Sequence, residues 1–184
     1  MNRWIRSVTR AGLGLVTLAA SLVLPTTAAA ANYVPAAGDW GPYYIVNNAN
    51  HRCLDAAAQG NGANGTRIQI WDCYPPTQHN QMWYLHWLTN DSFEVINDAS
   101  GTCLDAPAQW GGVDGTPLQL WDCYPPTQYN QMWSLKSMPD GGRRIQGVQS
   151  NRVLYPAGDG NGSTVQLLYV ETTDLRESWT LVQY

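Results

Sequence analysis

The chain has 184 residues, a formal net charge of −4 and an unusual aromatic composition, with 9 Trp and 10 Tyr but 1 Phe. The balance of 14 acidic against 10 basic residues argues against a protein that binds nucleic acid or anionic membranes. The 17 Gly and 11 Pro interrupt every stretch before a helical period is established, so the chain is predicted to be all-β.

Residues 1–31 have the pattern of a secretory signal peptide. Three arginines precede an apolar run at residues 11–24, and the alanines that end at Ala31 provide a small-residue cleavage site. The apolar run is shorter than the roughly 20 residues that span a bilayer. We therefore expect cleavage after Ala31, secretion, no membrane insertion, and a single mature domain at residues 32–184.

The rest of the chain repeats itself three times. Cys53-Leu54-Asp55-Ala56 recurs at 103–106 and, as Val153-Leu154-Tyr155-Pro156, at 153–156, which is a spacing of 50 residues each time (53 to 103 to 153). A second segment, 71–83, matches 121–133 at 12 of 13 positions. The repeats span about residues 41–88, 89–138 and 139–184.

Each repeat alternates short apolar runs with turn-forming residues, as β-hairpins do. In the first repeat, Tyr44-Ile45-Val46 and Ile68-Gln69-Ile70 are predicted strands, and residues 61–65 (Asn-Gly-Ala-Asn-Gly) are a predicted turn. A repeat too small to bury its own apolar face must pack against its siblings. Three copies are therefore expected to close around a shared axis as a barrel, which removes exposed sheet edges.

This pattern resembles the ricin B-type lectin family. The family has a Cys-Leu-Asp opening, a Gln-x-Trp segment on a hairpin and a closing Gln-x-Trp in each of three subdomains, and the match covers about Gly41 to Tyr184. The resemblance implies a β-trefoil of three pseudo-symmetric repeats. It also implies a lectin for glycans or polysaccharides, of galactose or plant-polysaccharide type. We expect this lectin to be monomeric and multivalent, with no catalysis, cofactor or metal.

The four cysteines form two pairs at equal spacing, 53 to 73 and 103 to 123. The third repeat replaces both members of its pair, by Val153 and Val170, as a bonded pair would be lost. In an exported chain an even cysteine count indicates disulfides, so Cys53–Cys73 and Cys103–Cys123 are predicted. The alternative, a metal site, lacks the close Cys or His spacing that zinc needs.

The resemblance also places the sugar contacts. In the family they fall on the Asp after Cys-Leu, on the Gln and the aromatic residue of the hairpin, and on the Asn and Gln of the closing motif. The matching residues are Asp55, Gln69, Trp71, Asn80 and Gln81 in the first repeat, and Asp105, Gln119, Trp121, Asn130 and Gln131 in the second. Tyr74 and Tyr124 directly follow cysteines and are expected at the rims of the sites.

These residue types suit a sugar, because an ionised Asp accepts charge-assisted hydrogen bonds from hydroxyls, an amide donates and accepts, and Trp covers an apolar ring face. For Asp55 the alternative is an exposed turn residue bonded to its own backbone. The closing Gln of each repeat is open to a structural role. So is the hairpin Gln, because the eroded third repeat keeps it as Gln166.

The third repeat departs at the positions that matter, with Tyr155 in place of Asp, Leu168 of Trp, Arg176 of Asn and Glu177 of Gln. It is expected only to close the barrel; a changed specificity built on Tyr155 and Arg176 is the alternative. All three repeats keep the last Trp, including the eroded one, so these are predicted core residues: Trp83, Trp133 and Trp179.

Two other functions remain to be weighed against a lectin. A glycoside hydrolase acting through Asp55 and Asp105 needs two carboxylates about 5 to 10 Å apart, whereas equivalent positions of different repeats should lie farther apart. A trefoil that binds protein, for example a protease inhibitor with relict sugar sites, has the same fold, and fold alone does not decide function. Two complete sets of site residues favour the lectin.

Overall fold

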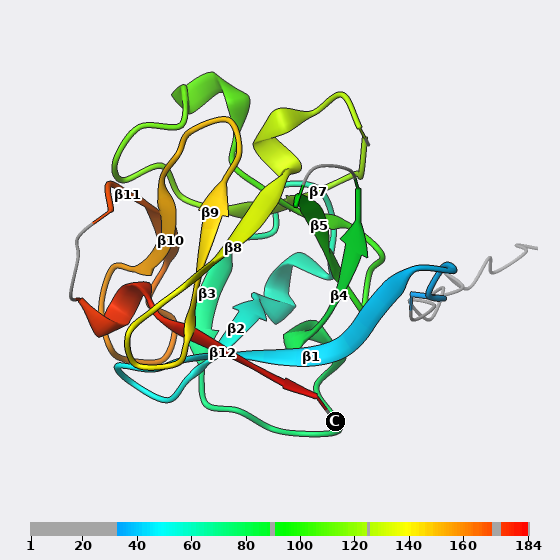
Figure 1. Ribbon diagram of the computed structural model, residues 1–184. Coiled ribbons are helices and arrows are strands. Elements are labelled where there is room, and N and C mark those ends of the chain that lie inside the picture. Colours follow the sequence, from blue (N-terminus) through cyan, green and yellow to red (C-terminus); the bar gives the residue numbers. More distant parts are fainter. Residues whose placement is uncertain (1–32, 89–90, 125, 171–173, 184) are drawn as a thin grey trace, which may run out of the picture.

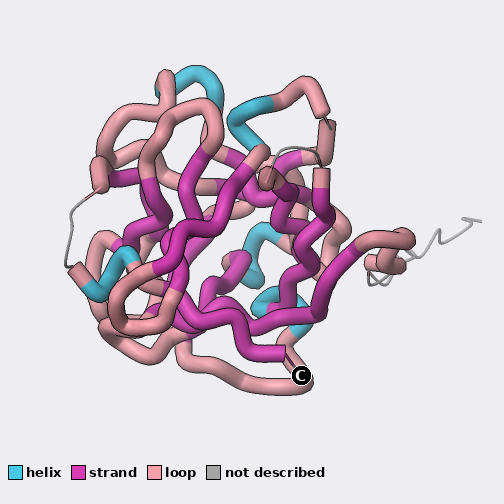
Figure 2. The backbone as a smooth tube through the Cα atoms, viewed as in Figure 1, coloured by secondary structure: helices cyan, strands magenta, loops and turns pink. Residues whose placement is uncertain are grey.

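The computed structural model describes residues 33–88, 91–124, 126–170 and 174–183. The predicted signal peptide, residues 1–31, lies outside the described residues. Within them the chain forms twelve β-strands, and its helical segments are short 3-10 turns in the loops (Figures 1 and 2), so the predicted all-β class is confirmed. The described residues contain no helix long and apolar enough to cross a membrane.

Each repeat contributes four strands. The first has β1 (Asp39–Asn47), β2 (Cys53–Ala56), β3 (Ile68–Trp71) and β4 (Met82–Trp87). The second has β5 (Phe93–Asn97), β6 (Cys103–Asp105), β7 (Gln119–Trp121) and β8 (Trp133–Ser137). The third has β9 (Arg143–Gly147), β10 (Val153–Pro156), β11 (Val165–Leu168) and β12 (Trp179–Gln183).

The first and last strands of each repeat close a six-stranded antiparallel barrel. Going round, β1 pairs with β4, β4 with β5, β5 with β8, β8 with β9, β9 with β12 and β12 with β1. The last pairing, between β1 and β12 (Figure 1), joins the first and last strands of the described residues. In its register Tyr43 lies opposite Gln183 and Asn47 opposite Trp179. Closure leaves this part of the sheet without free edges.

The middle strands of each repeat form a hairpin, and the three hairpins share one register. Asp55 on β2 lies opposite Gln69 on β3, and Asp105 on β6 lies opposite Gln119 on β7. In the third hairpin Tyr155 on β10 lies opposite Gln166 on β11. The register therefore sets each Asp beside its hairpin Gln before any side chain is considered.

The last Trp of each repeat is in the core, as predicted. Trp83, Trp133 and Trp179 are each 0% exposed, and each donates its indole N–H to a backbone carbonyl of its own hairpin. The acceptors are the carbonyls of Leu54 at 3.0 Å, Leu104 at 3.1 Å and Leu154 at 3.2 Å. Because a buried indole N–H needs an acceptor, this bond fixes each hairpin onto the barrel.

The two predicted disulfides are present. Cys53 bonds Cys73, and Cys103 bonds Cys123, with Cα atoms 5.2 and 5.1 Å apart. Each disulfide joins the first residue of one hairpin strand, β2 or β6, to the segment that follows the other hairpin strand, β3 or β7. The cysteines thus tie down the chain immediately after Trp71 and Trp121.

Candidate functional site

Two cavities lie at equivalent places of the first and second repeats. Their volumes are about 270 and 210 Å³. The first is lined by Asp55, Ala58, Gln59, Gln69, Trp71, Tyr74, Gln78, Asn80 and Gln81. The second is lined by Asp105, Pro107, Ala108, Gln109, Gln119, Trp121, Tyr124, Gln128, Asn130 and Gln131. All five site residues predicted for each repeat are thus brought together, with the predicted rim tyrosine beside them.

Asp55 lies at the base of the first cavity, held by three amide donors. Its side chain is nearly buried, and one carboxylate oxygen, Oδ1, accepts a hydrogen bond from Gln69 Nε2 at 2.8 Å. Oδ2 accepts bonds from Asn80 Nδ2 at 2.9 Å and Gln81 Nε2 at 3.0 Å. A buried strand residue held in this way is not the exposed turn residue of the alternative interpretation.

The second cavity repeats this geometry. Asp105 Oδ1 accepts from Gln119 Nε2 at 2.9 Å, and Oδ2 accepts from Asn130 Nδ2 at 2.8 Å and Gln131 Nε2 at 3.0 Å. The Asn and Gln come from equivalent 3-10 turns, η2 (His79–Gln81) and η4 (Tyr129–Gln131). Because the same turn follows both hairpins, the two sites are copies in space as well as in sequence.

Burial and hydrogen bonding act on the two carboxylates in opposite directions. Removal from water raises the pKa of Asp55 and of Asp105 above the usual value, since it disfavours the charged form. The three amide donors lower the pKa by stabilising the charged form, and burial prevails. Each amide donor occupies one acceptor direction, and a carboxylate has about four, so acceptor capacity remains at each carboxylate.

An exposed aromatic plate stands beside each carboxylate. Trp71 and Trp121 end β3 and β7 and are 36% and 38% exposed. Each lies two residues after the hairpin Gln, which puts both side chains on the same face of the strand. The adjoining Tyr74 and Tyr124 are about half exposed, as expected of rim residues.

The closing Gln of each repeat contributes to the structure as well as lining the cavity. Gln81 is 1% exposed; its Oε1 accepts the backbone N–H of Tyr74 at 3.0 Å, and its Nε2 donates to the carbonyl of Asp72 at 2.9 Å. Gln131 makes the same bonds to Tyr124 and Asp122, at 3.0 and 2.8 Å. The structural role left open for these residues is therefore present.

Four further glutamines line the cavities and were not among the predicted site residues. They are Gln59 and Gln78 in the first repeat and Gln109 and Gln128 in the second. Gln59 and Gln109 lie on matching 3-10 turns, η1 (Ala58–Gly60) and η3 (Ala108–Trp110). The signal was available in the sequence, because each pair recurs at the repeat spacing of 50 residues (59 to 109, 78 to 128).

The corresponding surface of the third repeat is covered by its own side chains. Tyr155 is 8% exposed and donates its hydroxyl to Asp174 Oδ2 at 3.0 Å. The guanidinium of Arg176 lies 4.9 Å from the centre of the Tyr155 ring and 3.1 Å from the same Asp174 oxygen. Glu177, in place of the closing Gln, is fully buried and bonds Arg144 at 2.7 Å.

No set of three or more His, Cys, Asp or Glu side chains in the described part of the chain is arranged to hold a metal ion. The two cavities contain one carboxylate each, on Asp55 and Asp105. What they offer a ligand is therefore hydrogen-bonding groups around a buried carboxylate, next to an aromatic face.

The family model of the ricin-type β-trefoil lectin domain matches residues 41–179. The chain therefore belongs to this family of β-trefoil proteins, and a carbohydrate-binding role is supported. No curated protein matches the sequence.

Solved structures agree with this fold. The designed three-fold symmetric protein ThreeFoil aligns with a TM-score of 0.70 and 21% identity, over 80% of this chain and 99% of its own. The C-half of an earthworm R-type lectin, solved with GalNAc, aligns with a TM-score of 0.61 and 18% identity, over 79% and 100%. An exo-β-1,3-galactanase from Clostridium thermocellum aligns with a TM-score of 0.70 and 23% identity, over 83% of this chain and 31% of its own.

Proposed function

We propose that this protein is a secreted lectin that binds glycans at two equivalent sites, in the first and second repeats, and does not transform them. The observation that carries the proposal is the pairing, in each of the two cavities, of a buried carboxylate with an exposed indole. The ring face and the hydroxyls of a sugar require these two groups together.

In the proposed sites the carboxylate and the amide side chains form hydrogen bonds with different hydroxyls of the sugar. Asp55 and Asp105 each use their remaining acceptor direction for one sugar hydroxyl. Asn80 and Asn130 accept from a second hydroxyl through Oδ1, because both N–H groups of each amide already donate within the protein. The C–H face of the ring packs on Trp71 or Trp121. The amide donors already in place hold each carboxylate in one orientation before the ligand arrives. Such preorganisation lowers the ordering cost of binding.

The proposed ligands are galactose-type or plant-polysaccharide sugars. Open polar sites of this size exchange water for hydroxyls at little net gain, so each site should bind a single sugar near the millimolar range, about −4 kcal/mol. A monomer with two such sites binds surfaces more tightly than single sugars by engaging both at once. The two disulfides suit the oxidising environment that a secreted protein meets.

The carboxylate count speaks against a glycoside hydrolase. Such enzymes flank one glycosidic bond with two carboxyl groups about 5 to 10 Å apart. Each cavity here has one carboxylate among its lining residues, Asp55 or Asp105, in a different repeat. Release of reducing sugar from a polysaccharide, abolished by Asp55→Asn, would overturn the proposal that the protein does not act on its ligand.

A glycan array followed by titration calorimetry tests the binding function. We expect retention on galactose-containing or xylan-type glycans, two sugars bound per chain, and agglutination of glycan-coated beads. Absence of binding to every glycan at high protein density would instead favour a trefoil that binds proteins.

A further inference from the structure

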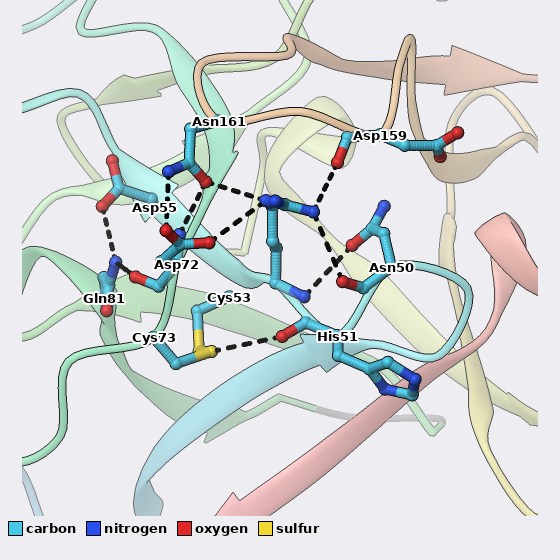
Figure 3. Close-up of polar contacts among 10 residues, drawn as sticks. Asn50, His51, Cys53, Asp55, Asp72, Cys73, Gln81, Asp159 and Asn161 are labelled. Atoms are coloured by element: carbon cyan, nitrogen blue, oxygen red, sulfur yellow. Dashed lines mark hydrogen bonds and ion pairs between the residues drawn. A yellow bond between two sulfur atoms is a disulfide. The ribbon is translucent and has the colours of Figure 1, made fainter.

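The residue after each aromatic plate is clamped by an asparagine of another repeat. At the first site, Asp72 follows Trp71, and its backbone N–H donates to Asn161 Oδ1 at 2.9 Å. Asn161 Nδ2 in turn donates to Asp72 Oδ2 at 2.9 Å. Asn161 belongs to the third repeat, in the loop between β10 and β11, and Figure 3 shows it reaching across to Asp72 from that loop.

The second site has the same clamp from the first repeat. Asp122 follows Trp121; its N–H donates to Asn64 Oδ1 at 2.8 Å, and Asn64 Nδ2 donates to Asp122 Oδ2 at 2.8 Å. Asn64 lies between β2 and β3, the loop equivalent to that of Asn161. Each site of the pair is therefore bounded by a loop from a different repeat, in cyclic order.

The clamp connects to the buried carboxylate through two further hydrogen bonds. Gln81 Nε2 donates both to the carbonyl of Asp72, at 2.9 Å, and to Asp55 Oδ2, at 3.0 Å (Figure 3). In the second repeat Gln131 Nε2 joins Asp122 and Asp105 at 2.8 and 3.0 Å. Movement of Asp72 or Asp122 would thus disturb both the plate before it and the acceptor beneath it.

The junction between the second and third repeats shows that the fold forms without the Asn clamp. Backbone pairing between neighbouring repeats occurs at all three junctions, from Gly162 to Ile70, Gly65 to Leu120 and Gly115 to Leu167, at 2.9, 2.8 and 2.8 Å. At the third junction, however, Asp114 takes the place of the clamping Asn and pairs with Arg152 at 2.6 Å. Tyr169 follows Leu168 there, where the other repeats have Asp after Trp. The trefoil therefore closes without the clamp.

We propose that Asn161 and Asn64 are positioning residues for Trp71 and Trp121, so that the third repeat, which lacks a site of its own, completes the site of the first. The inference rests on the proposed lectin function of these cavities. It adds that binding at each site depends on a neighbouring repeat and identifies the residue that carries the dependence.

The first site is held more firmly than the second. Arg52 donates from Nε to Asn161 Oδ1 at 2.8 Å and from Nη1 to the carbonyl of Asp159 at 2.6 Å, and its Nε lies 3.3 Å from Asp72 Oδ1. Thr102 takes the place of Arg52 in the second repeat, and its hydroxyl reaches the carbonyl of Gly62 at 3.4 Å. Arg52 therefore supports the clamp of the first site alone.

The test uses two backgrounds with one site each. Asp105→Asn leaves the first site, Asp55→Asn leaves the second, and Asn161→Ala or Asn64→Ala is added to each. The probe is whichever of galactose, lactose and xylotriose the wild type binds best in calorimetry. We expect Asn161→Ala to weaken the first site about tenfold and to spare the second, and Asn64→Ala, although in the first repeat, to do the reverse.

A second readout does not depend on any sugar. In ¹⁵N relaxation of the indole N–H groups, Asn161→Ala should raise the mobility of Trp71 and leave that of Trp121 unchanged, and Asn64→Ala should do the opposite. Asp114→Asn, at the third junction, is the matched control and should change neither indole. A wild type that binds no sugar would defeat the proposed function, and the relaxation data would still decide the positioning role.

Equal weakening of both sites by either variant, together with a lower melting temperature, would mean that the asparagines only support the fold. Unchanged affinity and unchanged indole mobility in the clamped repeat would overturn the proposal directly. Asn161→Asp offers a further check, because it keeps the shape but sets a second carboxylate against Asp72. It should reproduce the selective loss at the first site.

Discussion

The first two repeats and the third share one framework but differ at the surface over it. All three keep the buried Trp that bonds a hairpin carbonyl, at Trp83, Trp133 and Trp179. The first two repeats have a carboxylate held by three amides beside a partly exposed indole. In the third repeat Tyr155 lies against the guanidinium of Arg176. The core Trp is therefore kept in a repeat that has neither the carboxylate nor the indole of the two cavities.

The largest expected effect is on binding, and it tests whether the first two repeats are true equivalents. Hydrogen bonds to charged groups contribute roughly 1.5 to 3 kcal/mol, so Asp55→Asn or Asp105→Asn should weaken its own site at least tenfold. In calorimetry each single variant should keep one site and lose bead agglutination, and the double variant should bind nothing. Full affinity in the double variant would show that the carboxylates do not contact the sugar.

A substitution in the core should affect the third repeat as strongly as the others. Trp179→Ala removes a fully buried side chain and should lower the free energy of unfolding by about 3–5 kcal/mol. Trp71→Ala, at a partly exposed plate, should change stability far less while abolishing binding at its site. Urea denaturation of both variants makes the comparison; equal destabilisation would mean that Trp71 is a core residue.

The disulfides also distinguish the first two repeats from the third, which has Val153 and Val170 in place of the cysteines. Closing a loop of 20 residues contributes about 3 kcal/mol per disulfide in the chain-entropy model. Loss of both should leave a domain of this size unfolded, so we expect folding only under oxidising conditions. Thermal melts with and without reductant test this; an unchanged midpoint would contradict it.

Acid should weaken sugar binding at both proposed sites before it unfolds the protein. Burial raises the pKa of Asp55 and Asp105, so protonation and loss of the charged acceptor begin above the usual pKa of 3.8. A carboxyl whose pKa is raised by folding binds its proton more readily in the folded state, so these two groups do not promote acid unfolding. When the pH is lowered from 7 to about 4, sugar affinity should fall while the circular dichroism signal of the folded protein is kept. Loss of affinity and of the folded signal at the same pH would contradict this.

The smallest effect is expected at the third repeat. Tyr155→Ala should leave the stoichiometry at two sugars per chain, because this lobe has neither the carboxylate nor the plate. Calorimetry with the same sugar as for the Asp variants is the measurement. A wild-type stoichiometry of three, reduced to two by this change, would restore the alternative of a third site built on Tyr155 and Arg176.

Much of the molecule could be predicted because it repeats. The repeat spacing indicated three copies around one axis, the disulfides and the core, and the resemblance to ricin B-type lectins implied the trefoil. The register then brings Asp55 beside Gln69. The burial of Asp55 under three amides was not predicted, because its neighbours at 80 and 81 come from a turn whose path the pattern does not fix.

The contacts between repeats could not be predicted from the sequence, for a different reason. Asn161 lies 89 residues from its partner Asp72, and Asn64 lies 58 from Asp122. Deletions shift the third repeat, so that Asn161 does not fall at the 50-residue spacing. A repeat alignment shows what each copy contains, whereas these contacts depend on how neighbouring copies meet.

The seam between β1 and β12 also has a consequence for how the chain is assembled. Tyr43 can pair with Gln183 only after β12 has been synthesised, so the barrel cannot close on a chain that still lacks this strand. Contacts of such long range slow folding, because the loop between them must be ordered first. Until β12 is available, β1 and β9 each lack one barrel partner, and their unpaired edges can pair with other chains.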